Sequence, residues 1–133
     1  MKISRLFQWG VILASSAPMP LFAVTGIETY QAVCAVCHGP GLNGAPKLGD
    51  KAQWAPLIKE PPAQLIGHGY VGVRAMPPKG GKPDLSVSDF ANAVVYMVNQ
   101  SGGKWTEPNE KMLIQINKEI KKREASISSS KKP

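Results

Sequence analysis

The chain has 133 residues, a length that favours a single domain. Sixteen Lys and Arg residues outnumber nine Asp and Glu residues, which gives a formal net charge of +7 at pH 7. Hydrophobic residues make up 43% of the chain, enough for a packed core, although few of them are aromatic. With two Cys and two His, the chain is neither a disulfide scaffold nor a protein with several metal sites.

The first 23 residues have the organisation of a cleaved secretory signal peptide. Lys2 and Arg5 precede a mostly apolar stretch, residues 6–17, and two prolines follow before the small residue Ala23. The apolar stretch is shorter than the roughly 20 residues that a membrane-spanning helix needs. We therefore expect residues 1–23 to be removed on export and the mature protein to reside in the periplasm.

Apolar side chains recur at spacings of three and four residues in the rest of the chain, as they do along the buried face of a helix. Alternation of apolar and polar residues never persists over five positions, so we predict an all-α fold. Gly- and Pro-rich stretches at 39–49 and 72–85 are predicted loops. The predicted helices cover about residues 26–38, 53–59, 61 to 67 or 69, 86 or 88 to 100, and 108–124.

Residues 34–38 read Cys-Ala-Val-Cys-His, the C-x-x-C-H pattern of covalent haem c attachment. Two thiols on one helical turn can add to the two vinyl groups of a single porphyrin, and the adjacent His38 can then ligate the iron. The pattern occurs once, so we expect one haem c, held by Cys34 and Cys37. A large apolar cofactor would also complete a core that is short of aromatic residues.

Three other uses of these residues fit the sequence less well. Thioredoxin-like redox chemistry needs a strand-rich fold, which the pattern does not predict. A structural zinc ion bound by Cys34, Cys37, His38 and His68 would have ligand spacings unlike those of zinc fingers. A disulfide between the two Cys residues would close a very small loop and stabilise little.

The second axial ligand of the iron has two main candidates, Met76 and His68. Met76 precedes Pro77 and Pro78, which hold the backbone around the thioether extended and stiff. It also lies far in sequence from His38, as a ligand on the opposite face of the haem requires. We prefer Met76, which would raise the reduction potential because a thioether favours reduced iron. His68 remains the alternative.

These features resemble class I cytochrome c, and the chain is most similar to the bacterial cytochrome c5 family. The resemblance extends over about residues 26–102 and is most specific at the Met-Pro-Pro loop and the Tyr-Met pair of the following helix. Many members carry a further Cys pair after the Met loop, where this chain has Lys-Pro-Asp at 82–84. The matching stretches are residues 30–38, 44–48, Trp54, 75–81 and 94–97.

The resemblance implies a small class I cytochrome c fold, in which three to five short helices wrap around one covalent haem. It implies thioether links at Cys34 and Cys37, with His38 as the proximal ligand and Met76 as the distal ligand of the iron. The mono-haem domain would then cover residues 24–103.

The resemblance also implies supporting roles for residues around the haem. The carbonyl of Pro46 would accept a hydrogen bond from the His38 ring and orient it. Trp54 would pack beside the haem propionates or serve as an ordinary core residue, and Tyr30 would pack where the first and last core helices cross. Arg74 would neutralise a propionate or remain solvated.

Residues 104–133 form a basic extension with eight basic and four acidic residues, a net charge of +4. Its apolar residues between 112 and 120 share one face of an extra C-terminal helix, and residues 128–133 are a predicted disordered end. We expect the apolar face to pack on the haem domain. Docking of the basic residues on an acidic partner, or weak contact with anionic lipid, is the alternative. Nucleic acid is not an expected partner.

The sequence therefore predicts a periplasmic mono-haem c-type cytochrome that carries single electrons between respiratory redox partners. With two axial ligands from the protein, the iron has no open position for a substrate, so we expect no catalytic residues. The alternative is a haem-c electron-transfer subunit of a larger periplasmic or membrane-bound oxidoreductase complex. A small-ligand sensor or a peroxidase-like site is a third hypothesis and requires a labile Met76.

Overall fold

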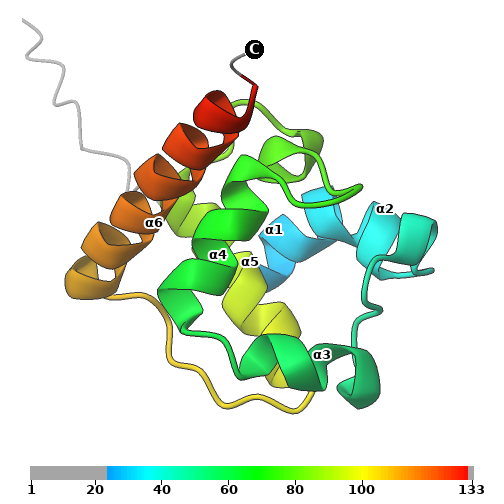
Figure 1. Ribbon diagram of the computed structural model, residues 1–133. Helices are drawn as coiled ribbons and strands as arrows, with labels where there is room; N and C mark the ends of the chain where they lie inside the picture. The colour runs from blue at the N-terminus through cyan, green and yellow to red at the C-terminus, as the bar shows by residue number, and fades with distance from the viewer. Residues whose placement is uncertain (1–23, 132–133) are drawn as a thin grey trace, which may run out of the picture.

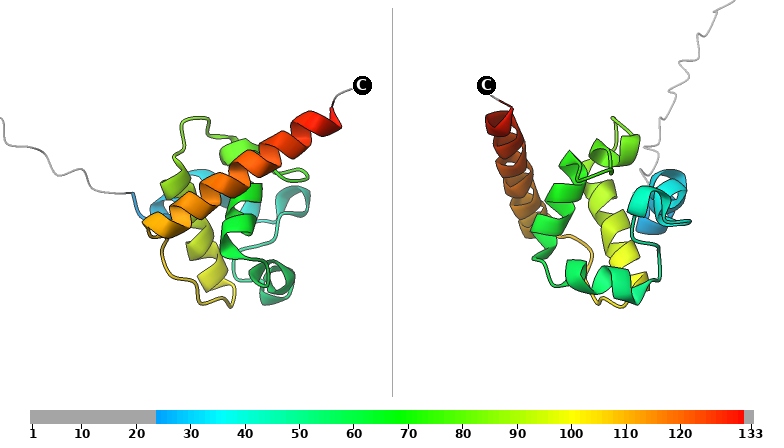
Figure 2. Two further views of the ribbon diagram at one scale, coloured as in Figure 1. Left: turned by 60° about the vertical axis from the view of Figure 1, so that its left-hand side comes forward. Right: turned by 45° about the vertical axis from the view of Figure 1, so that its right-hand side comes forward.

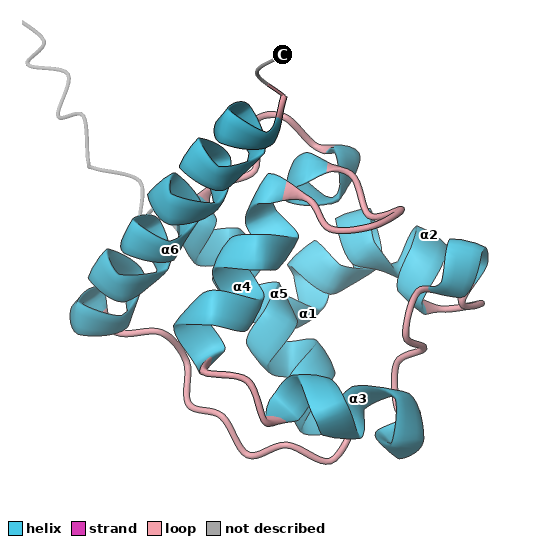
Figure 3. Ribbon diagram, in the orientation of Figure 1, coloured by secondary structure: helices cyan, strands magenta, loops and turns pink. Residues whose placement is uncertain are grey.

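The computed structural model describes residues 24–131, which form helices joined by loops (Figures 1 and 3). These residues contain no strand, only an isolated bridge between Val73 and Met76, so the predicted all-α fold is confirmed. The predicted signal peptide lies outside the described residues. The helices are α1 (Gly26–Thr29), the π-helix η1 (Tyr30–Cys34), α2 (Ala35–His38), the 3-10 helix η2 (Leu42–Gly44), α3 (Lys51–Ile58), α4 (Pro62–Val71), the 3-10 helix η3 (Pro78–Gly81), α5 (Val87–Gln100) and α6 (Glu110–Ser130).

The first helical stretch runs without a break from α1 through η1 to α2, over the predicted residues 26–38. It begins with a capping box, in which the Thr25 side chain accepts from the backbone N–H of Glu28 and the Glu28 carboxylate accepts from the backbone N–H of Thr25. The wide turn of η1 was not predicted. A π turn carries one extra residue, so it changes the direction of the side chains that follow it, including Cys34.

The first stretch crosses α5 at the centre of the molecule (Figure 1). Of the two predicted starts of this helix, Ser86 and Ser88, the structure uses Ser86, whose hydroxyl caps α5 by accepting from the backbone N–H of Asp89 over 3.0 Å. At the crossing, the rings of Tyr30 and Tyr96 lie 5.4 Å apart between centroids. α5 supplies half of the buried hydrophobic residues of the described chain, namely Phe90, Ala91, Ala93, Val94, Val95, Met97 and Val98.

α4 begins with Pro62 at its first turn, as predicted, but the predicted end at Gly67 or Gly69 is wrong because the helix continues to Val71. Both glycines are packing positions rather than helix ends. A Cβ on Gly67 would lie 2.9 Å from the Cβ of Glu119 in α6, and a Cβ on Gly69 would lie 3.2 Å from the Phe90 ring in α5. The small residues therefore let α4 pack closely between α5 and α6.

α6 packs along α4 through Ile116 and Ile120, which are 0% and 7% exposed. The expectation that the apolar face of the extension packs on the domain is confirmed. The helix crosses one side of the domain and continues beyond it (Figure 2). It ends at Ser130, so the predicted disorder over 128–130 is wrong; the serine hydroxyls at the end of α6 donate to carbonyls three residues earlier and support the last turns. Within residues 24–131, no helix is both long and apolar enough to cross a membrane.

Candidate functional site

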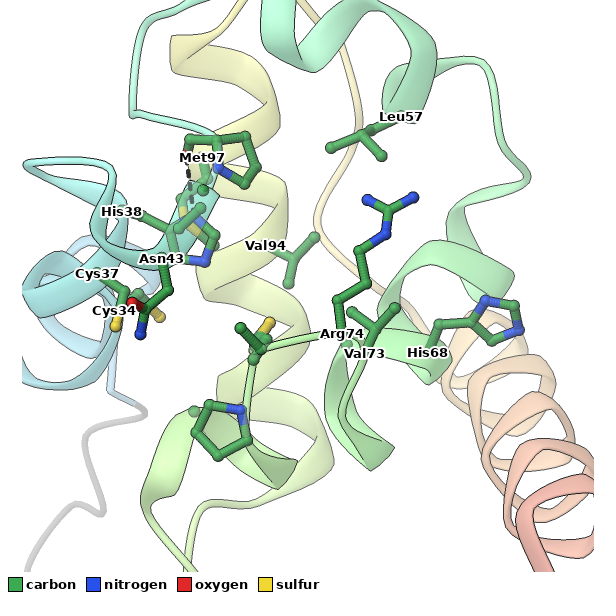
Figure 4. Close-up of a pocket in the computed structure, with 18 of the residues that line it drawn as sticks. Cys34, Cys37, His38, Asn43, Leu57, His68, Val73, Arg74, Val94 and Met97 are labelled. Atoms are coloured by element: carbon green, nitrogen blue, oxygen red, sulfur yellow. Dashed lines mark hydrogen bonds between the residues drawn. The ribbon is translucent and has the colours of Figure 1, made fainter. Parts of the chain in front are cut away.

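A largely apolar cavity of about 220 Å³ lies between the first helical stretch, α3, α4, α5 and the loop that leads to η3 (Figure 4). All of the predicted site residues line it except Tyr30, which lies at the crossing of α1 and α5. Further apolar side chains, which the sequence did not place at the site, complete the walls. They include Leu57, Leu65, Val94 and Met97, and the signal that could have found these four is their place on the apolar faces of helices.

The two cysteines lie on one side of the cavity, because η1 and α2 hold both of them on consecutive turns (Figure 4). No disulfide joins them; Cys34 is buried and Cys37 is half-buried. Burial, with a smaller contribution from the charge of Cys37, raises the pKa of the Cys34 thiol to about 11. Before haem attachment, Cys34 is therefore a neutral thiol at physiological pH, and it keeps this side of the cavity apolar.

His38 ends α2 and is 7% exposed. Its Nδ1 lies 2.8 Å from the carbonyl oxygen of Pro46. Because a carbonyl only accepts hydrogen bonds, Nδ1 carries the proton, and Nε2 is the ring nitrogen that is left with a free lone pair. The loop at Pro46 therefore fixes both the tautomer and the direction of the imidazole.

Trp54 supports this loop from α3. Its side chain is 3% exposed and its indole Nε1 donates to the carbonyl of Lys47 over 2.8 Å. The backbone N–H of Leu48 donates to the carbonyl of His38 over 2.7 Å, which connects the other end of the loop to α2. Trp54 thus lines the cavity and also holds in place the segment that orients His38, a role that its sequence context did not reveal.

Met76 belongs to the opposite wall, on the loop between α4 and η3. Its backbone N–H donates to Val73 over 2.9 Å, and its carbonyl accepts from Val73 over 3.1 Å, which closes a tight turn. A Cβ on Gly69 would lie 3.9 Å from the terminal methyl group of Met76, so the side chain packs against α4. Figure 4 shows this loop, marked by Val73 and Arg74, facing Cys37 and His38 across the cavity.

The two remaining candidates lie at the rim. The side chain of Arg74 is exposed and extends toward Leu57 across the mouth of the cavity, while the His68 ring is directed away from His38 (Figure 4). Arg74 has a left-handed backbone with φ of 53°, a conformation that the tight turn before Met76 requires. Of the two candidates for the second axial ligand, Met76 is thus the one whose surroundings hold it in the cavity wall.

These residues fit a covalently attached haem. The cavity walls are apolar, as a porphyrin plane requires, and two neighbouring thiols lie at one side. An imidazole with a free Nε2 and a thioether, the ligand pair that cytochromes c use, come from opposite walls. Arg74, which is exposed, places a cation beside the cavity.

An all-helical domain with a C-x-x-C-H helix at an apolar cavity defines a c-type cytochrome. The family model described as cytochrome c oxidase, cbb3-type, subunit III matches residues 23–97, more than half of the chain. The chain therefore belongs to this cytochrome c family, and it binds haem c covalently. It is a class I cytochrome c, similar to cytochrome c5.

Named relatives support the same assignment. Cytochrome c-555 of Chlorobaculum thiosulfatiphilum is 48% identical over 83 residues, which cover 59% of this chain and 96% of the relative. Cytochrome c-555 of Chlorobaculum tepidum is 42% identical over 103 residues, 74% of this chain and 95% of the relative. Cytochrome c5 of Azotobacter vinelandii is 36% identical over 77 residues, 56% of this chain and 93% of the relative.

A solved structure shares the fold. It is a chain from the crystal structure of an electron-transfer complex of nitrite reductase with cytochrome c, 38% identical to this chain with a TM-score of 0.55. The match covers 57% of this chain and 93% of the other. Nearly all of the other chain is therefore matched, whereas a large part of the present chain lies outside the match.

Proposed function

We propose that this protein is a periplasmic mono-haem cytochrome that carries single electrons between respiratory redox partners. The observation that supports this most directly is a single apolar cavity lined by both thiols, by His38 with its Nε2 free, and by Met76. When bound, the haem supplies a one-electron couple that needs no substrate site on the protein.

In this proposal, Cys34 and Cys37 hold the haem through thioether bonds, and His38 and Met76 are the two axial ligands. The Pro46 carbonyl, 2.8 Å from Nδ1, keeps the His38 ring in one orientation and makes its Nε2 a stronger donor to iron. The apolar walls exclude water from both ligands. With both residues as ligands, the chain would leave no coordination position of the iron open to small molecules.

Absorption spectroscopy of the purified haem protein tests the ligand assignment. We expect the ferric protein to show the weak charge-transfer band of thioether-ligated iron, and Met76→Ala to lose it. His68→Ala is the matched control, because His68 lines the same cavity but is directed away from it, and this variant should keep the band. Loss of the band in the His68 variant with retention in the Met76 variant would reverse the assignment.

The proposed location depends on the signal peptide predicted at residues 1–23. Cell fractionation and intact-protein mass spectrometry test it. We expect the haem protein in the periplasmic fraction, with a mass that corresponds to a chain beginning at Val24 plus one haem. A haem protein that retains its first 23 residues would contradict the proposed cleavage.

A second candidate is a haem-c subunit of a larger oxidoreductase complex. The matched family, described as subunit III of a cbb3-type oxidase, favours it, whereas a neighbour crystallised in an electron-transfer complex with nitrite reductase favours a carrier that binds partners. Native sizing of membrane extracts and periplasmic fractions distinguishes the two. A protein that elutes alone supports the carrier, and a stable high-mass complex supports the subunit.

A further inference from the structure

Arg123 of α6 reaches the loop that carries Met76. Its Nη2 donates to the carbonyl oxygen of Gly72 over 3.5 Å, and its Nε is buried without a hydrogen-bond partner. Within residues 24–131, no carboxylate forms an ion pair with this guanidinium. Buried polar groups normally have hydrogen-bond partners, and this guanidinium has one, a backbone carbonyl, in place of an opposite charge. The contact therefore needs a structural explanation.

Gly72 forms one unit with the Met76 turn. Its φ of +100° lies in the left-handed region, and a Cβ there would lie 3.1 Å from the Pro78 nitrogen and 3.2 Å from the Met76 carbonyl oxygen. The next residue, Val73, exchanges two backbone hydrogen bonds with Met76. Gly72 therefore lies against the backbone on both sides of Pro77, and a restraint on its carbonyl restrains the whole turn.

α6 provides a firm base for this restraint. Ile120, one turn before Arg123, is buried, and a Cβ on Gly67 would lie 3.3 Å from the Ile120 backbone nitrogen. The backbones of α4 and α6 are thus in close contact at the turn that precedes the loop. Arg123 projects from the anchored part of α6, not from its free end.

We propose that Arg123 is a positioning residue that stabilises the sixth axial bond of the haem iron by holding the Gly72 carbonyl and, through it, the Met76 turn. This inference rests on the proposed role of Met76 as a ligand. α6 lies beyond the matched family region, residues 23–97, and contributes none of the described residues that line the cavity. The extension therefore acts on the haem site indirectly, through the end of α4.

Imidazole binding to the ferric haem protein tests the proposal, because imidazole must displace the thioether. Arg123→Gln removes the cation and its fork of donors, and we expect its imidazole affinity to rise about tenfold or more, the factor for loss of one hydrogen bond with a charged donor. Lys122→Gln is the matched control on the same turn, with a side chain that is 77% exposed, and it should remain within about twofold. Arg123→Lys keeps a cationic donor and should lie between.

Two further measurements separate this role from a general loss of stability. Amide hydrogen exchange at Val73 and Met76 should be faster in Arg123→Gln, with little change in α5. Val98→Ala, which removes a fully buried side chain far along α5, should lower the unfolding midpoint without a comparable rise in imidazole affinity. An equal rise in this variant would assign the effect to global stability and overturn the proposal.

The remaining outcomes distinguish this proposal from the assignment of the ligand. If Arg123→Gln binds imidazole no better than the wild type while Met76→Ala binds it tightly, the proposed restraint is wrong and Met76 remains the ligand. If Met76→Ala and the wild type bind imidazole equally well, Met76 is not the ligand, and the role of Arg123 falls with it.

Discussion

Gly26 is the position where one added methyl group should cost the fold most. It is the first residue of α1, at the crossing with α5. A Cβ there would overlap the carbonyl oxygen of Asn92 and would lie 2.8 Å from its carbonyl carbon and 3.3 Å from the Cβ of Tyr96. Because the opposing atoms belong to the backbone of α5, no rotamer change relieves the overlap. Gly26→Ala must push the two helices apart.

The expected loss of unfolding free energy is about 3 kcal/mol. Overpacking of a well-packed contact costs about 1–3 kcal/mol or more, and loosening of the Tyr30–Tyr96 pair adds about 1 kcal/mol. The better helix propensity of Ala offsets at most about 1 kcal/mol of this loss, and less at the first position of a helix. For a domain whose total stability is about 5–15 kcal/mol, this change is large.

Guanidinium chloride unfolding of the haem protein, followed by circular dichroism, measures the loss. With a slope of about 3 kcal/mol per molar, the midpoint should fall by about 1 M. Asn92→Ala is the control: it shortens the side chain but leaves the backbone carbonyl, so it should not rescue Gly26→Ala in the double variant. A single variant within about 0.5 kcal/mol of the wild type, or rescue by Asn92→Ala, would refute the reasoning.

Three other measurements test the packing around the site. Trp54→Phe should lose about 2 kcal/mol of unfolding free energy, because the carbonyl of Lys47 loses its 2.8 Å donor; an unchanged midpoint would contradict this. Ile116→Ala should lose about 2–5 kcal/mol if α6 packs as described, and nothing if it does not. The pKa of Glu28 is lowered from 4.5, first by the backbone N–H and then by the side chain of Thr25, so its stabilisation is present above pH 4.5 and disappears as the pH falls through the lowered value. Glu28→Gln should remove that part of the acid dependence of the unfolding midpoint, and an identical pH profile would count against it.

Local signals predict the helices of this fold well, and tertiary contacts decide where local signals fail. The cap at Ser86 and the apolar stripe behind it are sufficient to place α5 to within two residues. Gly67 and Gly69, in contrast, have the local signature of a helix end, and only their contacts with Glu119 and Phe90 explain why α4 continues past both. The π turn of η1 inserts a residue that a 3.6-residue periodicity cannot detect.

The candidate site likewise contains residues that the sequence identifies and contacts that only the fold brings together. The spacing of Cys34, Cys37 and His38 is a chemical requirement and is visible in the sequence as it stands. The contact of Pro46 with the His38 ring follows from the family resemblance rather than from any local pattern. The contact of Arg123 with Gly72 joins residues that are far apart in the chain and has no sequence signature, since an isolated arginine on an exposed helix usually indicates only a solvated charge.

The distribution of charge follows from the packing of α6. Of the formal charge of +7, the predicted signal peptide carries +2, residues 24–103 carry +1, and residues 104–133 carry +4. Since α6 turns its apolar side toward α4, its lysines at positions 111, 118, 121 and 122 are exposed, and none of the described α6 residues lines the cavity. The basic character of the chain is therefore concentrated in residues 104–133, and the exposed lysines of α6 lie on the side of that helix that faces away from α4. A change of charge on these lysines should act on the association of the protein with other molecules, whereas a change at Arg123, on the inner side, should act on the iron.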